Sequence, residues 1–254
     1  MPEITADRRF ADGRLVRSPA EGSLNEMDEY GVEAALRLAE TAGDNAEVIA
    51  LSLAPETADV AVRKAYQMGA DRGVRITDDA FAGSDYFGTA SALAAAIRRL
   101  GEDKPIDLVV AGMTALDGLG SVVPALLAAE LGWPGLTLAA TVSLDGGVLT
   151  IEREIDDIVE TLSAPLPVVL SVTDAANTPR LPDFKRIMAA RTKPVERWTA
   201  ADLDIDPAEV GSAGARTSVA EATPRPPRPP ATIVVDKGEG GKALAEFLIA
   251  NDLV

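Results

Sequence analysis

Short apolar runs alternate with helical segments through the first half of the chain. The runs are rich in branched residues, as is typical of strands buried on both faces, and they lie at 47–53, 73–77 and 106–111. Helices are predicted from apolar residues at helical spacing in the segments 24–42, 55–68 and 84–100. Strands and helices that alternate across short connections predict a parallel sheet wound by right-handed crossovers. The expected fold class is therefore α/β, with a doubly wound, mostly parallel sheet.

The stretch 106–134 is predicted to be strand, loop and helix, and its loop is a candidate ligand site. The loop, 112–120, contains three glycines and Asp117. Glycine lets a backbone approach a ligand closely, and the following helix offers unpaired N–H groups to an anion. We interpret it as a phosphate or adenylate loop. The alternative is an ordinary turn between a strand and a helix, because neither GxGxxG nor GxxxxGK[ST] spacing is present.

Arginines recur in the polar amino-terminal residues, at Arg8, Arg9, Arg14 and Arg17. They are either solvated charges or a basic strip beside a nucleotide site. The sequence leaves both interpretations open.

Composition narrows the chemistry available to the chain. It has no cysteine and no histidine, so disulfides, thiolate metal sites, cysteine nucleophiles and the usual general base are absent. The formal net charge of −16 argues against nucleic acid or an anionic membrane surface as a partner. No run reaches the roughly 18 apolar residues of a membrane span, and the amino end lacks the apolar region of a signal peptide. We expect a cytoplasmic protein without a metal site or direct membrane insertion.

The regular alternation ends after Pro134. The segments 136–144 and 148–155 flank an Asp-Gly-Gly turn at 145–147, which predicts a hairpin, and 160–162 is a candidate third strand. A further buried strand is expected at 167–173. The second half is therefore expected to add an antiparallel extension to the parallel sheet.

A basic segment with an apolar tip follows at 177–190. Phe184, Ile187 and Met188 lie next to Lys185 and Arg186, which is unusual in so acidic a chain. One interpretation is a helix that packs Phe184 into the core. The other is a docking segment whose apolar tip enters the pocket of a partner.

Composition changes again in the last part of the chain. Residues 206–231 are rich in proline, alanine, threonine and serine, which favours an extended conformation over a packed core. Helical character returns at 238–254. We expect a nucleotide-binding α/β domain at 1–205 and, at 206–254, a proline-rich arm with a C-terminal helix that packs on a partner subunit. A tail folded back on its own domain is the alternative.

Three segments together resemble the β subunit of electron transfer flavoprotein (ETF), in the family that includes FixA-like proteins. They are GMTALDGLGSVVP from Gly112, IEREIDDIVETLSAPLPVVLS from Ile151, and NTPRLPDFKRIMAA from Asn177. The second is the most specific, because it combines an R-E-x-D pair, an E-x-L and a P-x-V-V strand. The resemblance extends from the amino-terminal residues to the C-terminal helix.

The resemblance implies a fold, cofactors and partners. The fold is of the adenine nucleotide α-hydrolase type, and the β subunit forms a heterodimer with an ETF α subunit that holds FAD in a cleft. The β subunit supplies one wall of that cleft and carries AMP as a structural ligand. The heterodimer takes electrons from acyl-CoA dehydrogenases and other flavin dehydrogenases and passes them to ETF-quinone oxidoreductase and the respiratory chain. The β chain is expected to be no enzyme, with no catalytic residue.

Matching the motifs residue by residue places the family's AMP contacts at the first helix, the strand 47–53 and the loop. The positions are Asn25, Met27, Asp28, Leu53, Gly112, Met113, Thr114, Ala115, Leu116, Asp117, Gly118, Leu119, Gly120, Ser121, Val122 and Val123. Helix N-termini and a glycine-bearing loop at the carboxyl ends of strands are where a doubly wound sheet binds nucleotides. The docking residues are Phe184, where the family usually has leucine, Ile187 and Met188. Arg153 and Glu154 either face the α subunit and flavin or pair with each other.

Two departures from the family leave alternatives open. The family begins with a central strand that is missing from this sequence, so the strands 47–53 and 108–111 would carry unpaired backbone groups. The loop has Gly118 to Ser121 where some members carry acidic or amide residues. The ligand could therefore be a second FAD in place of AMP, as in the members of the family that bifurcate electrons. A stand-alone adenine-nucleotide-binding protein of the universal-stress-protein type is the remaining alternative.

Overall fold

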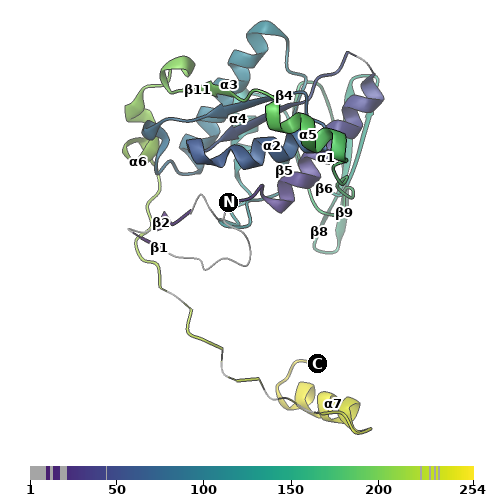
Figure 1. Ribbon diagram of the computed structural model, residues 1–254. Helices are drawn as coiled ribbons and strands as arrows, with labels where there is room; N and C mark the ends of the chain where they lie inside the picture. Colours follow the sequence, from purple (N-terminus) through teal and green to yellow (C-terminus); the bar gives the residue numbers. More distant parts are fainter. Residues whose placement is uncertain are drawn as a thin grey trace. The chain divides into compact units, whose positions relative to one another are not determined.

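A computed structural model describes residues 10–11, 14–17, 22–43, 45–223, 225–228, 230–231, 233 and 235–254. Two compact units are present, Met1–Ala220 and Glu221–Val254 (Figure 1). The first unit contains the sheets and the candidate sites. In the second unit the described residues form one helix, α7 (Gly240–Ala250).

The parallel strands in the described part of the chain form two three-stranded sheets. In one, β4 (Arg72–Ile76) lies between β3 (Ile49–Leu53) and β11 (Glu196–Trp198). In the other, β10 (Val168–Val172) lies between β5 (Leu108–Gly112) and β6 (Gly135–Ala139). The parallel strands predicted from the branched apolar runs are confirmed.

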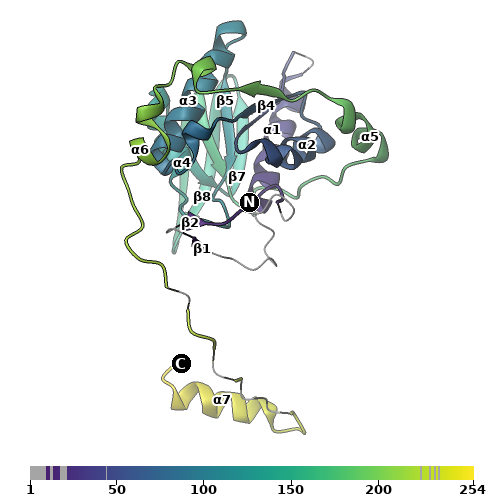
Figure 2. The same ribbon diagram turned by 60° about the vertical axis from the view of Figure 1, so that its left-hand side comes forward.

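Helices cover both faces of the parallel strands, as Figure 2 shows. The four that pack on the strands are α1 (Glu26–Ala42), α2 (Asp59–Met68), α3 (Tyr86–Asp103) and α4 (Val123–Leu131). α1 contacts β5 and β10, α2 contacts β3 and β4, and α3 contacts β3 and α4. Capping residues set where these helices begin and end. The Asp85 carboxylate accepts the N–H groups of Phe87 and Gly88 at the start of α3. Gly69, with φ of 139°, ends α2. The doubly wound α/β class is therefore confirmed.

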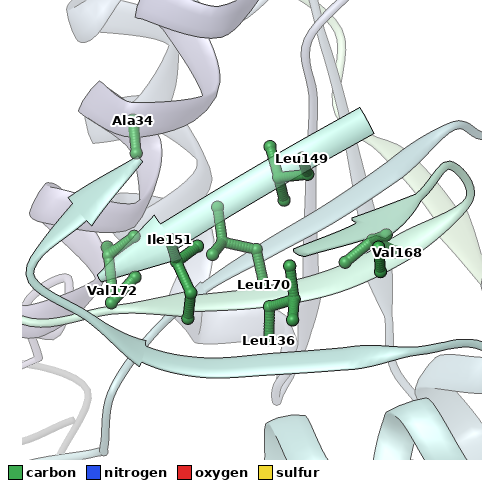
Figure 3. Close-up of a cluster of buried hydrophobic side chains, with 9 residues drawn as sticks. Ala34, Leu136, Leu149, Ile151, Val168, Leu170 and Val172 are labelled. Atoms are coloured by element: carbon green, nitrogen blue, oxygen red, sulfur yellow. The ribbon is translucent and has the colours of Figure 1, made fainter. Parts of the chain in front are cut away.

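The core is centred on β10, whose five residues are all buried. On one face, Val168, Leu170 and Val172 pack against Leu149 and Ile151 from an antiparallel sheet (Figure 3). Ala34 of α1 and Leu136 of β6 complete this cluster. Full burial on both sides explains why the sequence of β10 is apolar without alternation.

The antiparallel extension consists of β7 (Thr141–Asp145), β8 (Val148–Ile155) and β9 (Ile158–Pro165), in that order. The predicted strand 136–144 is wrong as one element, because β6 pairs in parallel with β10 and β7 pairs with β8. The chain leaves the sheet of β5, β10 and β6 near Leu138, whose φ is 63° and whose N–H donates to the Ser171 hydroxyl at 3.0 Å. A non-glycine residue in the left-handed region marks the bend.

β3 and β5 are edge strands, and no described strand pairs with their second edges. Both strands are apolar but mostly half-buried, in contrast to β10. Leu51 of β3 and Val109 of β5 border one core cluster, formed by α3, α4 and β10. The expectation that these two strands carry unpaired backbone groups stays a prediction, because residues 1–9, 12–13 and 18–21 lie outside the described part of the chain.

The remaining elements of the first unit are short. They are β1 (Phe10–Ala11), β2 (Arg14–Leu15), η2 (Glu56–Ala58), η3 (Asp79–Phe81), α5 (Phe184–Thr192), η4 (Ala201–Leu203), η5 (Pro207–Glu209) and α6 (Gly211–Gly214). Val210 is buried with Ile76 and Phe81, so residues 206–220 pack with the α/β unit although their composition resembles that of the arm. No described helix is both long and apolar enough to cross a membrane.

Candidate functional site

The loop between β5 and α4 rests on the start of α1. Asn25 occupies the N-cap position but bonds to the loop instead of capping the helix. Its Nδ2 donates to the carbonyl of Thr114 at 2.7 Å, and its Oδ1 accepts the N–H of Leu116 at 3.1 Å. Asp28 Oδ1 accepts the N–H of Gly112 at 3.0 Å. Two side chains predicted as nucleotide contacts thus hold the loop in place.

Glycine is required at 112 by the close approach of α1. A Cβ atom there would lie 2.4 Å from the backbone carbon and oxygen of Met27. Gly31 meets the same strand end, where an added Cβ would lie 3.0 Å from the carbonyl carbon of Ala111. The sequence suggested that Gly112 lets the loop approach a ligand, whereas the structure shows it in contact with a helix.

The first turn of α1 is acidic, with Glu26, Asp28 and Glu29. Burial raises the pKa of Asp28, although hydrogen bonds from Asn25 and Gly112 act in the opposite direction. Carboxylates already occupy the positive end of this helix dipole and would repel a phosphate. Of the two helix N-termini expected near the nucleotide, that of α1 is therefore the less suited to an anion.

The N-terminus of α4 has the opposite character. Val122 stands at the N-cap without a side-chain cap, and the first turn contains no acidic residue. No described residue accepts a hydrogen bond from the backbone N–H of Gly120, Val122 or Val123. Unpaired N–H groups at the positive end of a helix dipole are the donors that phosphate oxygens need.

The residues before α4 adopt an unusual backbone conformation. Leu119 and Ser121 have φ of 50° and 53°, in the left-handed region that side chains other than glycine rarely adopt. The N–H of Ser121 donates to the hydroxyl of Thr114 at 3.3 Å, which ties the two ends of the turn together. Residues held in such conformations by their surroundings cluster at ligand sites.

Two further side chains border the loop. The ring of Tyr86 lies so close to Gly120 that an added Cβ would stand 2.7 Å from it. Arg17 Nε donates to Asp117 Oδ2 at 2.7 Å, and the Asp117 side chain is only 4% exposed. Of the amino-terminal arginines, Arg17 lies beside the candidate site, Arg14 bonds to Ser212, and Arg8 and Arg9 fall outside the described residues. The role of Tyr86 had no signal in the sequence, since it depends on where α3 begins.

One of the residues predicted to contact the nucleotide lies apart from the others. Leu53 ends β3, in the other parallel sheet, and packs beside a cluster that includes Ile76 and Phe81. Among the described residues, no hydrogen bond or ion pair joins Leu53 to the loop. Met27 lies in the first turn of α1, where its backbone approaches Gly112. The remaining predicted positions run from the end of β5 through the loop to the start of α4.

A second candidate site begins at the predicted docking segment, whose first residues are fastened to α1. Asn177 Nδ2 donates to the carbonyl of Tyr30 at 3.0 Å. The guanidinium of Arg180 bridges two carboxylates of α1, with Nε 2.7 Å from Glu33 Oε2 and Nη1 2.6 Å from Glu40 Oε1. The hydrogen bonds that Arg180 donates to both carboxylates raise the pKa of its guanidinium further above the ordinary value. Glu33 is buried and Glu40 is exposed, so this partly buried network fastens the start of the segment to α1.

The side chains that follow Arg180 point to solvent. Leu181 is 90% and Phe184 78% exposed, and Met188 is also exposed, whereas Ile187 is half-buried. α5 is anchored by buried Ala190 and by Arg186, whose Nη1 donates to the carbonyl of Met68 at 3.0 Å. The interpretation that Phe184 belongs to the core is therefore wrong. Leu181 was not among the predicted docking residues, although it lies in the same motif.

Arg153 pairs across the β8–β9 hairpin and not with its neighbour Glu154. Its Nη2 lies 2.6 Å from Glu160 Oε2, and the two residues are directly opposite in the strand register. Glu154 is on the other face of the hairpin and is exposed.

The fold and the site together define a doubly wound α/β protein with a candidate anion site where β5 meets α4, the place where such sheets bind nucleotides. A family model, the electron transfer flavoprotein domain, matches residues 12–203. The chain belongs to the electron transfer flavoprotein family.

Similar proteins cover most or all of the chain. Electron transfer flavoprotein subunit beta of Mycobacterium tuberculosis (strain ATCC 25618 / H37Rv) is 42% identical over 259 residues, which is 100% of this chain and 96% of that protein. The protein of the same name from Mycobacterium leprae is 41% identical with the same coverage. That from Thermoanaerobacterium thermosaccharolyticum is 37% identical over 216 residues, 84% of this chain and 81% of its own length. These matches support a role for this chain in electron transfer, as the β subunit of an electron transfer flavoprotein.

Proposed function

We propose that the chain is the β subunit of a heterodimer in which it binds AMP as a structural ligand and an α subunit carries FAD. The observation that carries the AMP proposal is the uncapped N-terminus of α4, where the N–H groups of Gly120, Val122 and Val123 have no acceptor among the described residues. Asn25 and Asp28 act indirectly, by holding the loop that presents those groups. The AMP phosphate is expected at α4, and the base and ribose along the loop 112–119.

The residue types in this chain limit the chemistry that it can contribute to the heterodimer. When bound in the α subunit, FAD supplies the redox chemistry. This chain has neither histidine nor cysteine, so its residues have the tasks of binding and positioning, and we propose that it performs no chemistry of its own. It would contribute one wall to the flavin cleft.

The exposed apolar residues of the segment 181–188 are proposed as the docking surface for electron donors. Leu181, Phe184 and Met188 are exposed on a base fixed by Arg180 and Ala190. Large apolar side chains on a rigid base are the usual anchors of transient interfaces. Acyl-CoA dehydrogenases are the proposed donors, in fatty acid β-oxidation, and a quinone oxidoreductase of the respiratory chain is the proposed acceptor.

The second unit, Glu221–Val254, is proposed to pack on the α subunit. Its helix α7 exposes large apolar side chains that the described residues of this chain do not bury, at Leu244, Phe247 and Ile249. An apolar helix at the end of a proline-rich arm is suited to a groove on another subunit. We propose a cytoplasmic location for the assembled heterodimer.

Co-expression with the α-subunit gene of the same organism tests the proposal. We expect a yellow heterodimer, and mass spectrometry of the ligands released on denaturation should find FAD and AMP in equal amounts. Two FAD molecules and no AMP would instead indicate a bifurcating type. A colourless, self-sufficient homodimer with bound adenine nucleotide would contradict the proposal and favour a stand-alone protein of the universal-stress-protein type.

A further inference from the structure

Tyr86, the first residue of α3, lies against the turn that leads into α4. If Gly120 carried a Cβ atom, this atom would stand 2.7 Å from Cε1, from Cζ and from Oη of the tyrosine. The ring therefore packs directly on the backbone of Gly120, and only glycine leaves room for it there. The Asp85 cap fixes the first turn of α3, and α3 in turn packs against α4, so the ring is held in this place.

The hydroxyl of Tyr86 is a hydrogen-bond donor without an acceptor among the described residues, and 41% of the residue is exposed. The N–H groups of Gly120, Val122 and Val123 also lack an acceptor in the described part of the chain. All of these donors lie at the positive end of the α4 dipole. Such a group of donors is suited to an anion that offers several oxygens.

The charged groups beside the turn are already matched to each other. Arg17 Nε donates to Asp117 Oδ2 at 2.7 Å, and the Asp117 side chain is only 4% exposed. Because the guanidinium and the carboxylate neutralise each other, this pair adds little net charge to the site. The Tyr86 hydroxyl is therefore a side-chain donor that remains available to a ligand at the start of α4.

The two ligands considered for this site differ in the phosphate that would reach these donors. AMP ends in a monoester phosphate with three free oxygens, whereas FAD and ADP carry a second phosphate on one of them. The base and ribose are expected along the loop 112–119, so the ligand reaches α4 from that side. A second phosphate would continue toward Gly120, where the Tyr86 ring already stands.

We propose that Tyr86 makes this site specific for a nucleoside monophosphate. Its hydroxyl donates to a terminal phosphate oxygen that the N–H groups at the start of α4 leave free, and its ring closes the position that a second phosphate would occupy. The inference rests on the proposed function, because it takes AMP as the ligand. It goes further by assigning the choice between AMP and a dinucleotide to a residue outside the loop.

The test removes first the hydroxyl and then the ring, and varies the ligand in parallel. The heterodimer and its variants are stripped of nucleotide in dilute urea, with the flavin absorbance as the check that each complex stays intact. Calorimetric titrations with adenosine, AMP and ADP follow. Tyr86→Phe is expected to raise the Kd for AMP about tenfold or more and to leave the Kd for adenosine within about twofold of the wild type.

Tyr86→Ala tests the ring. In the wild type we expect the Kd for ADP to exceed that for AMP by about 30-fold or more, and in Tyr86→Ala by less than about threefold. Tyr30→Phe is the matched control, because it deletes the hydroxyl of a half-buried tyrosine that packs beside the core cluster around β10. Its three Kd values should stay within about twofold of the wild type, and thermal melting of every variant should match the wild type.

The outcomes separate this inference from the proposed function. If the wild-type heterodimer binds none of the three ligands, the proposed AMP site is wrong. If it binds AMP and Tyr86→Phe leaves that Kd unchanged, or raises the Kd for adenosine equally, the hydroxyl does not contact the phosphate and the inference is overturned. Equal binding of AMP and ADP by the wild type, or a ratio that Tyr86→Ala leaves unchanged, would overturn the closing role of the ring.

Discussion

Asp28 of α1 accepts the backbone N–H of Gly112 at 3.0 Å, across the junction between the helix and the last residue of β5. The two residues are far apart in sequence, and Asn25 fastens the next part of the loop in the same way. The first turn of α1 therefore positions the residues that lead to α4, and the candidate phosphate site depends on α1 without touching it.

Replacing Asp28 should loosen the loop. Asp28→Ala leaves the N–H of Gly112 without its acceptor and removes one of the two acceptors of the Asn25 amide. We expect urea unfolding to show a loss of about 1–3 kcal/mol. The AMP content of the purified heterodimer should fall with it. Glu26→Gln, in the same turn but exposed, is the matched control and should change stability by less than about 1 kcal/mol. If the two substitutions lower stability equally, the loss comes from the helix dipole and not from the hydrogen bond to Gly112.

Asp117→Arg should weaken nucleotide retention. The Asp117 side chain is nearly buried and pairs with Arg17, so the substitution places a bulky cation against another cation inside a tight turn. We expect bound nucleotide, measured by mass spectrometry after denaturation, to fall about tenfold or more, on the assumption that the turn loses about 1.4 kcal/mol of binding free energy. Asp117→Asn keeps the shape and an acceptor for Arg17 and should lose much less. Normal AMP content in the arginine variant would contradict the assignment of this loop.

Phe184→Ala should slow electron transfer from an acyl-CoA dehydrogenase without releasing flavin. Because Phe184 is exposed, its removal should change the free energy of unfolding by less than about 0.5 kcal/mol. Stopped-flow reduction of the heterodimer measures the rate, and the flavin absorbance measures retention. Val60→Ala, which truncates an exposed apolar residue on α2, is the control. An unchanged rate would show that Phe184 is incidental to docking.

The Arg180 network predicts a loss of stability in acid. Burial raises the pKa of Glu33, but hydrogen bonds from Arg180 and Arg37 outweigh it and hold the pKa below its ordinary value of 4.5. Because the folded-state pKa of Glu33 lies below 4.5, its ion pairs make their full contribution to stability above pH 4.5. This contribution is lost as the pH falls through the folded-state pKa. We expect the stability difference between wild type and Glu33→Gln, from urea unfolding, to be largest near pH 7 and to shrink below pH 4.5. A difference that is independent of pH would exclude an ionised Glu33 as its source.

The two edge strands predict uneven hydrogen exchange. β10 has a neighbour on each side, whereas β3 and β5 each have one among the described strands. Amide exchange followed by mass spectrometry should therefore find peptides over 168–172 the best protected, with 49–53 and 108–112 exchanging faster. Equal protection of all three would mean that a segment outside the described residues pairs with these edges.

Much of this protein is determined by local sequence pattern. The apolar runs predicted β3, β4, β5 and β10, because a strand that is covered on both faces is apolar throughout. Helical spacing predicted α1, α2 and α3, because each of them buries one face. The parallel strands β6 and β11 were not predicted as such. The family also follows from sequence, through the specific motif from Ile151.

The partners of individual side chains are determined by the tertiary structure. Only the tertiary structure shows that Asn25 and Asp28 bond to the loop and that Gly112 accommodates α1. It also shows that the segment 136–144 divides between β6 and β7, and that Phe184 faces solvent. Arg180 likewise acquires its partners only when the segment after β10 crosses α1. Each of these depends on contacts between residues distant in sequence, and a local pattern records which side chains are apolar or charged but not what lies opposite them.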